Sequence, residues 1–342
     1  MPEQYLAGVF IGVAAGFANG SFALPLHYGR KWQWENTWVV FSVLSQVVLP
    51  WGVAWLATPH LFAILHGSPW SFLLPGLIAG LIWGVAQVMY GLGLAMVGIA
   101  VANSVVAGMA ATVGTVGPLL AYAPEKLLTR TGLVLLASLV LIVGGIYLYG
   151  KAGLRKEKET AGLAGPKPIV GGSFRTGMII CLTCGALGTA FIYGLGSSTS
   201  LLKAAAAAGT RPVFAACIAW AVTFGAGFVP NLTYCLYKMS KNRSAGALIH
   251  SGHFLRNSFL AGLMAVLWFG GVSMYGVAAG KIGRLGPSVG FGLFVSATVL
   301  SANFLGWLAG EWKGASSSTV RSFLAGMLLI VAAIVVIALG VG

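Results

Sequence analysis

Two stretches of the chain carry aromatic side chains and a primary amide at helical spacing, which is chemistry suited to binding a sugar. Trp83, Gln87 and Tyr90 are separated by four and three residues, so a helix would present all three on one face. Trp268 and Tyr275 are seven residues apart and would also share a face. Aromatic planes stack on the C–H face of a sugar ring, while amide and hydroxyl groups hydrogen-bond its hydroxyls. The alternative is that the rings pack between helices and that the amide joins two helices by a hydrogen bond.

Other polar side chains interrupt the apolar runs. Serine and threonine hydroxyls in helices often bond their own backbone, so none of them identifies a site alone. An asparagine inside an apolar run needs a polar partner and is therefore a candidate as well. The predicted substrate-binding residues are Asn19, Trp83, Gln87, Tyr90, Asn103, Thr112, Tyr193, Trp268, Tyr275, Ser296 and Asn303.

Titratable groups that could carry a proton through a membrane are few. The chain has six acidic residues, and none falls in the middle of an apolar run. His27, at the end of the first run, and Glu35, in the stretch KWQWENTW (31–38), are the coupling candidates. Glu35 could instead form an interfacial ion pair with Arg30 or Lys31. The three tryptophans and the lysine of this stretch are typical of an anchor in the headgroup region.

Enzyme chemistry and metal binding have little support in the sequence. No nucleophile–base pair is visible, and Cys181 and Cys184 form a C-x-x-C without a second cysteine pair or a histidine cluster. We interpret these cysteines as small packing residues. The sequence therefore predicts no cofactor, no metal and no enzymatic activity. An enzyme would show clustered acids, histidines or cysteines facing a cavity, and a sensor would carry a soluble output domain.

Composition indicates a polytopic α-helical membrane protein. The 342 residues are 58% hydrophobic and 8% charged, with a mean hydropathy of +0.91. Runs of about 18 apolar residues are long enough to cross the hydrocarbon core. A net charge of +14 would suggest nucleic acid in a soluble protein, but here it fits basic loops facing anionic lipid. The expected spans are 5–26, 37–57, 72–95, 99–122, 131–150, 175–195, 212–237, 257–280, 287–310 and 319–341.

The chain divides at a polar, Gly- and Pro-containing linker into two halves of five helices each. We expect a first repeat at 1–150, a linker at 151–174 and a second repeat at 175–342. The sequence around Trp83 resembles that around Trp268 at a constant offset of 185 residues, which also pairs Tyr90 with Tyr275. Because five helices reverse the direction of entry, these halves would form an inverted repeat.

The distribution of basic residues predicts the orientation. Fourteen of the 20 lysines and arginines fall on the side that holds the linker, and six fall on the side of the two termini. By the positive-inside rule the linker side is cytoplasmic, and both termini face outward.

Several motifs carry a resemblance to a known family. LPLHYGRKWQWENTW (24–38), IWGVAQVMYGLGLAMVGIAVANSVVAG (82–108), LKAAAAAGTRP (202–212) and GEW (310–312) are similar to the L-rhamnose–proton symporters of the drug/metabolite transporter superfamily. The resemblance covers nearly the whole chain. It implies ten helices in two inverted repeats and uptake of L-rhamnose, or a related deoxy or pentose sugar, with protons. It also implies the bacterial inner membrane, outward termini and a lipid bilayer as partner, without nucleic acid. A proton-independent uniporter and a metabolite exporter or exchanger stay open as alternatives.

Overall fold

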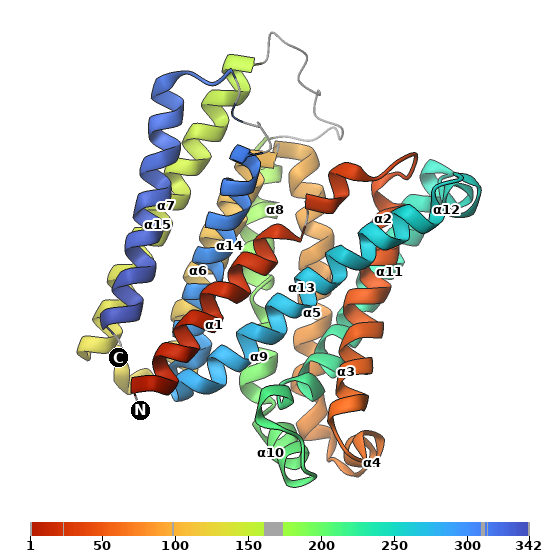
Figure 1. The fold of residues 1–342 in the computed structure, drawn as a ribbon, viewed down its shortest axis with the longest axis vertical. Coiled ribbons are helices and arrows are strands. Elements are labelled where there is room, and N and C mark those ends of the chain that lie inside the picture. Colours follow the sequence, from red (N-terminus) through yellow and green to blue (C-terminus); the bar gives the residue numbers. More distant parts are fainter. Residues whose placement is uncertain are drawn as a thin grey trace. The chain divides into compact units, whose positions relative to one another are not determined.

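The computed structural model describes residues 2–340 except 23, 98, 161–173, 309–311 and 313, and every regular element in that part is a helix. Figure 1 gives the arrangement. The first half contains α1 (Pro2–Ser21), η1 (Leu24–Tyr28), α2 (Trp34–Ser42), η2 (Val43–Val48), α3 (Leu49–Ala57), α4 (Leu61–Gly67), α5 (Trp70–Val97), α6 (Ile99–Tyr122), η3 (Pro124–Lys126) and α7 (Arg130–Thr160). The second half contains α8 (Phe174–Leu187), α9 (Ala190–Ser197), α10 (Thr199–Ala207), η5 (Pro212–Phe214), α11 (Cys217–Asn242), α12 (Ala245–His250), α13 (Phe254–Ile282), η6 (Gly283–Leu285), α14 (Gly286–Leu308) and α15 (Ser317–Gly340).

Within the described residues, seven stretches are long and apolar enough to cross a membrane, which confirms a polytopic membrane protein. They are Trp34–Ala57, Trp70–Gly93, Arg130–Lys156, Arg175–Ser197, Pro212–Asn242, Phe254–Leu305 and Ser317–Ile337. The seven stretches correspond to eight of the ten expected spans. The 52-residue stretch Phe254–Leu305 contains two expected spans, α6 contributes only a shorter apolar stretch, and α1 is not among the seven.

The chain forms two compact units, and each takes segments from both halves of the sequence. Unit 1 comprises Met1–Gly20, Met89–Thr189 and Ala278–Gly342, and unit 2 comprises Ser21–Val88 and Ala190–Val277. The chain passes from one unit to the other inside α5 and inside α13. The compact units are therefore a different division from the two predicted repeats.

In unit 1, glycines allow helices to approach closely. At Gly16 of α1, a Cβ would overlap the carbonyl oxygen of Phe294 on α14. The long helices α7 and α15 run side by side (Figure 1), and a Cβ at Gly145 of α7 would lie 2.7 Å from Ile330 of α15. The chain ends meet in this unit, because the Tyr5 hydroxyl donates a hydrogen bond to the Ile337 carbonyl (2.9 Å).

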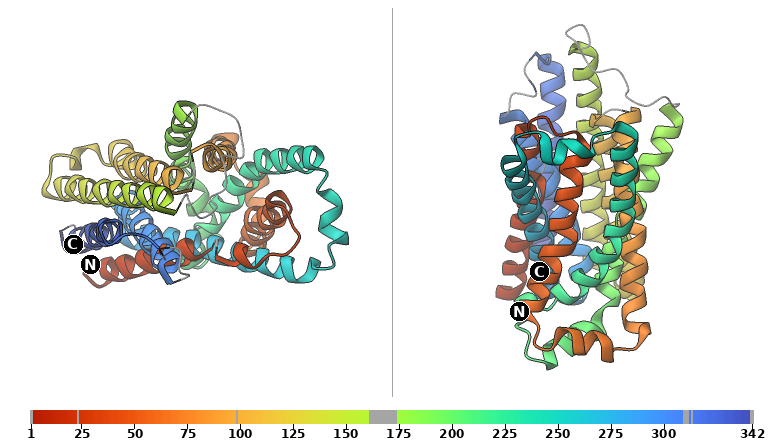
Figure 2. Two further views of the ribbon diagram at one scale, coloured as in Figure 1. Left: turned by 90° about the horizontal axis from the view of Figure 1, so that it is seen from above. Right: turned by 90° about the vertical axis from the view of Figure 1, so that its right-hand side faces the viewer.

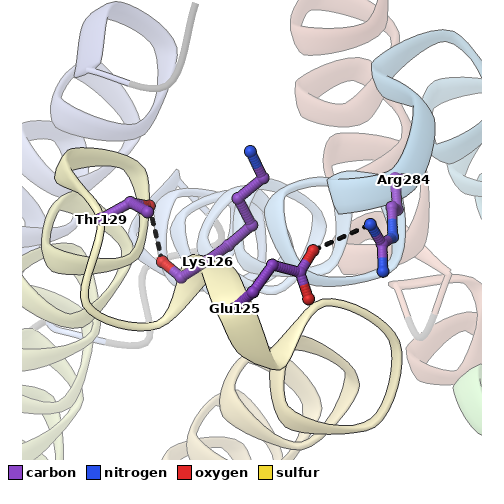
Figure 3. A network of polar contacts seen from close by, with 4 residues as sticks. All are labelled: Glu125, Lys126, Thr129 and Arg284. Carbon is purple, nitrogen blue, oxygen red and sulfur yellow. Dashed lines mark hydrogen bonds and ion pairs between the residues drawn. The ribbon is translucent and has the colours of Figure 1, made fainter.

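An ion pair joins two connections of unit 1. Arg284 of η6 and Glu125 of η3 point toward each other in Figure 3, with Nη1 and Oε1 2.8 Å apart. Beside them, the Thr129 hydroxyl donates to the Lys126 carbonyl (2.7 Å). Both charged side chains are half exposed or more, so the pair contributes about 0–1 kcal/mol to stability.

In unit 2, α2, η2 and α3 follow one another along one rod that leads into the short α4 (Figure 2) and pack against α11. The π-helical turn η2 has a local cause. Pro50 has no N–H to give to the Gln46 carbonyl, four residues earlier, and its ring clashes with that carbonyl in a regular α-helix. The Leu49 N–H bonds the Leu44 carbonyl instead, five residues back. The helix α5 also packs on α11, where a Cβ at Gly80 would overlap the Thr223 carbonyl.

Candidate functional site

An aromatic cluster fills the interior of unit 2 and brings together two of the predicted substrate-binding residues. Trp83 of α5 and Trp268 of α13 have ring centroids 5.6 Å apart. Phe224 of α11 lies against both, at 5.2 Å from Trp83 and 5.0 Å from Trp268. A Cβ at Gly227 would come within 2.7 Å of the Trp83 ring, so this glycine lets the indole lie against the α11 backbone. Trp83 is 3% exposed and is therefore packed in this conformation.

The cluster extends in two directions. Toward Tyr275, Trp220 stacks on Phe224 at 5.1 Å, and Phe191 lies 5.9 Å from Trp220 and 6.4 Å from Tyr275. Toward the N-terminus of α2, Phe41 lies 6.2 Å from Trp268 and 5.1 Å from Trp38. Trp83 of α5 and Trp268 and Tyr275 of α13 thus belong to one continuous aromatic layer within unit 2.

Buried polar groups without partners lie on the rod beside this layer. Ser42, Ser45 and Gln46 are 0–2% exposed, and their Oγ, Oγ and Oε1 atoms accept or donate no hydrogen bond. A buried polar atom without a partner costs about 1–3 kcal/mol, so such groups need an explanation. A π-helical turn is often found at functional sites. These three residues on or beside η2 can therefore offer hydrogen bonds to a polar ligand.

Glu35 lies buried at the N-terminus of α2. It is 2% exposed, and its Oε1 accepts hydrogen bonds from Asn242 Nδ2 (2.8 Å) and Ser244 Oγ (2.7 Å). The positive charge of Lys238 also acts on this carboxylate. The prediction of an ion pair with Arg30 or Lys31 is wrong, since hydroxyl and amide donors from the end of α11 hold the carboxylate.

The stretch KWQWENTW is therefore more than a surface anchor. Glu35, Asn36, Thr37 and Trp38 are buried inside unit 2, and Asn36 Nδ2 donates to the Ser244 carbonyl (2.9 Å). The anchor interpretation is wrong for Trp38, because the start of α2 docks on the connection between α11 and α12. The Trp38 indole N–H also reaches Asn231 Oδ1 of α11 (3.3 Å).

The remaining predicted residues are spread over both units. In unit 1, the Thr112 hydroxyl donates to the Gly108 carbonyl (2.8 Å), and Asn303 Nδ2 donates to the Val299 carbonyl (2.8 Å). The Thr112 bond is the backbone bond expected as the alternative for serine and threonine, and the polar partner of Asn303 is likewise the backbone of its own helix. Ser296 is fully buried with an unpartnered hydroxyl.

Several predicted residues have less definite surroundings. Asn19 of unit 1 is 9% exposed and Tyr90 of the same unit is half-buried, as are Gln87 and Tyr193 of unit 2. The side chains of Asn103 and His27 lie outside the described residues.

Comparison with known proteins identifies the family. A sequence model of the family described as "L-rhamnose-proton symport protein (RhaT)" matches residues 1–342. The chain belongs to this family. It is 24% identical over 347 residues to an L-rhamnose-proton symporter of Shigella dysenteriae serotype 1, and 25% identical over 351 residues to one of Mannheimia succiniciproducens. Each alignment covers 99% of both chains. As a member of a symporter family, the protein is a transporter and not an enzyme.

Sequence reasoning missed several residues that lie in the interior of unit 2. Gln46 stands in the apolar run VLSQVVLP (43–50), and the argument applied to Gln87 would have found it. Trp220 and Phe224 are four residues apart on one apolar helix, which is also the pattern of ordinary core packing. For these two aromatics the sequence contained no distinguishing signal.

Proposed function

We propose that this protein imports L-rhamnose together with protons across the bacterial inner membrane. The observation that carries the proposal is the match to the symporter family over residues 1–342. The named relatives align over 99% of both chains. Protons and L-rhamnose are accordingly its transported partners.

We further propose ten crossings in two inverted repeats, with both termini outside and the 151–174 linker in the cytoplasm. The order of elements supports the repeat, because a short helix (α4, α12) follows the second long stretch of each half and precedes a long helix (α5, α13). The unit boundaries support it too. Gly20 and Thr189 are separated by 169 residues, which is also the separation of Gly8 from Gly177 and of Gly16 from Gly185. Val88 and Val277 are separated by 189, close to the offset of 185 around Trp83.

The sugar site is proposed at the aromatic layer and the polar rod of unit 2. The indoles of Trp83 and Trp268 would stack on the sugar ring after a rearrangement that exposes Trp83. The unpartnered groups of Ser42, Ser45 and Gln46 would hydrogen-bond its hydroxyls. A ligand with several hydroxyls would satisfy these buried groups, whereas an apolar ligand would leave them unpaired. The other predicted contacts, including Gln87, Tyr90 and Asn103, stay predictions.

Glu35 is the proposed proton-binding group. It is a buried carboxylate held by two neutral donors, Asn242 and Ser244, with no paired cation in hydrogen-bond reach among the described residues. Both hydrogen bonds favour the charged carboxylate, so proton uptake would accompany a rearrangement that withdraws Asn242 or Ser244 from Oε1. Alternating access would then expose the sugar and Glu35 to one side of the membrane at a time.

Uptake of radiolabelled L-rhamnose into proteoliposomes, with and without an imposed pH gradient, tests the proposal. Symport predicts accumulation above the external concentration that disappears with a protonophore. Equilibration without accumulation would favour a uniporter. An absence of L-rhamnose uptake and of competition by any deoxyhexose would overturn the substrate assignment and favour an exporter or exchanger of other metabolites.

A further inference from the structure

A groove of about 570 Å³ opens in unit 1 between α6, α7 and α8. Its wall is apolar over most of its length, with Val105 contributed by α6, Ile146 by α7 and Leu182 by α8. Val143 and Leu182 are about 40% exposed, so the wall is accessible in this structure. Such a surface inside a membrane is in contact with lipid chains unless protein covers it.

One end of the groove is basic. Lys151, Arg155 and Lys158 line it from α7, at spacings of four and three residues, so they share the face of α7 that carries the apolar wall. All three side chains are exposed, and among the side chains that the structure describes no acidic one lines the groove. Glu159 lies one residue beyond Lys158, but its carboxylate is held by Ser316 at the start of α15.

The dimensions fit one leaflet of a bilayer. From Val143 to Lys158 the groove follows α7 for fifteen residues, which is about 22 Å of helix. Half of a bilayer, from the midplane to the outer edge of the headgroups, is also about 20–22 Å. The apolar part would therefore lie at the depth of the acyl chains and the three basic residues at the depth of the phosphates.

We propose that this groove binds an anionic phospholipid, with an acyl chain along the apolar wall and the phosphate between the three basic side chains. Charge favours this occupant over the alternatives within the protein. The linker residues 161–173 carry one charged residue, Lys167, which is itself basic. A second copy of the chain carries a net charge of +14 and would bring further positive charge rather than a counter-charge. A lipid phosphate supplies the missing negative charge.

Native mass spectrometry of the purified full chain with phosphatidylglycerol or phosphatidylcholine tests this site. Neutralising all three basic residues (Lys151→Gln, Arg155→Gln, Lys158→Gln) should lower the preference for phosphatidylglycerol by on the order of a hundredfold, since each contributes about fivefold. The matched control is Lys156→Gln on the same helix, whose ammonium lies over the Trp312 ring (5.3 Å). This control should leave the preference unchanged.

A second variant separates groove binding from surface attraction. A Cβ at Gly108 would make an ordinary 3.6 Å contact with Ile146, so Gly108→Leu should extend into the groove without moving the backbone. It should weaken retention of both lipids at least tenfold while thermal unfolding and L-rhamnose uptake show a folded protein. The proposal is overturned if the triple variant keeps its preference or if Gly108→Leu retains lipid like the wild type. It is equally overturned if the wild type retains no phosphatidylglycerol, as expected of a groove filled by residues 161–173 or by a second copy.

Discussion

Replacing Glu35 with glutamine should separate sugar movement from proton coupling. The Gln oxygen can still accept from Asn242 and Ser244, so both hydrogen bonds at Oε1 can be kept. Hydrogen bonds to a charged group contribute about 1.5–3 kcal/mol each and neutral ones about 0.5–1.5, so two weakened bonds should cost about 2 kcal/mol of stability. The variant should fold, but its side chain cannot take up a proton.

The expected size of the transport effect follows from the energy of a proton gradient. One pH unit is worth about 1.4 kcal/mol per proton, which drives about tenfold accumulation at one proton per sugar. In proteoliposomes under that gradient, the wild type should concentrate radiolabelled L-rhamnose about tenfold. Glu35→Gln should equilibrate the sugar to about onefold, while exchange of external for internal sugar continues.

Glu125→Gln is the matched control for loss of one carboxylate. Glu125 is half exposed in unit 1 and pairs with Arg284, so its neutralisation should leave accumulation at about tenfold. Tenfold accumulation by Glu35→Gln would refute the assignment of the proton to this residue. Equal loss in both variants would show that the effect is not specific to the buried carboxylate.

Three further perturbations follow from particular contacts. Gly16→Val should destabilise unit 1 by more than about 2 kcal/mol, because its side chain must overlap the α14 backbone. Gly270→Val should not destabilise the protein, because no atom lies within 4 Å of a Cβ at Gly270. Equal melting temperatures of the two variants in detergent would contradict the close packing at Gly16. Gln46→Leu should keep or raise stability, since its Oε1 is unpartnered, but weaken L-rhamnose binding by calorimetry; unchanged affinity would remove it from the site. Hydrogen bonds from Ser316, which have the largest effect, and from Thr319 hold the pKa of Glu159 below its ordinary value. The contribution of the charged Glu159 to stability should therefore be present above the ordinary pKa and be lost as the pH falls through the lowered pKa. Glu159→Gln should remove that pH dependence from thermal unfolding, and an unaltered acid profile would contradict it.

The helices were predictable because hydrophobic periodicity and length dominate in a membrane. The expected span 37–57 corresponds to the rod Trp34–Ala57, and its start differs by three residues for a local reason. Asn36 Oδ1 accepts from the Gln33 backbone N–H (3.0 Å), so the helix begins before the apolar run does. Hydropathy averages over such a turn, whereas the hydrogen bonds at a helix end depend on one or two polar residues.

The partners of polar residues were not predictable, because they come from distant parts of the chain. The donors to Glu35 lie more than 200 residues away in sequence, and the nearby Arg30 and Lys31 were the only partners that local spacing could suggest. A buried carboxylate selects donors by geometry in the folded unit, and a single sequence does not contain that geometry.

A single sequence also does not distinguish aromatic residues that stack on a substrate from those that pack in the protein interior. The spacing of Trp83 and Gln87 predicted one helical face, but the rings that lie against Trp83 come from α11 and α13. Phe224 contacts both indoles, so any sugar that enters between Trp83 and Trp268 must displace or share its ring. At the proposed site, substrate binding and the packing of unit 2 would therefore be alternatives for the same surfaces. In such a transporter, the bound sugar would replace contacts between aromatic rings, so sugar binding would favour a different conformation. A permanently open aromatic site would bind sugar without that coupling.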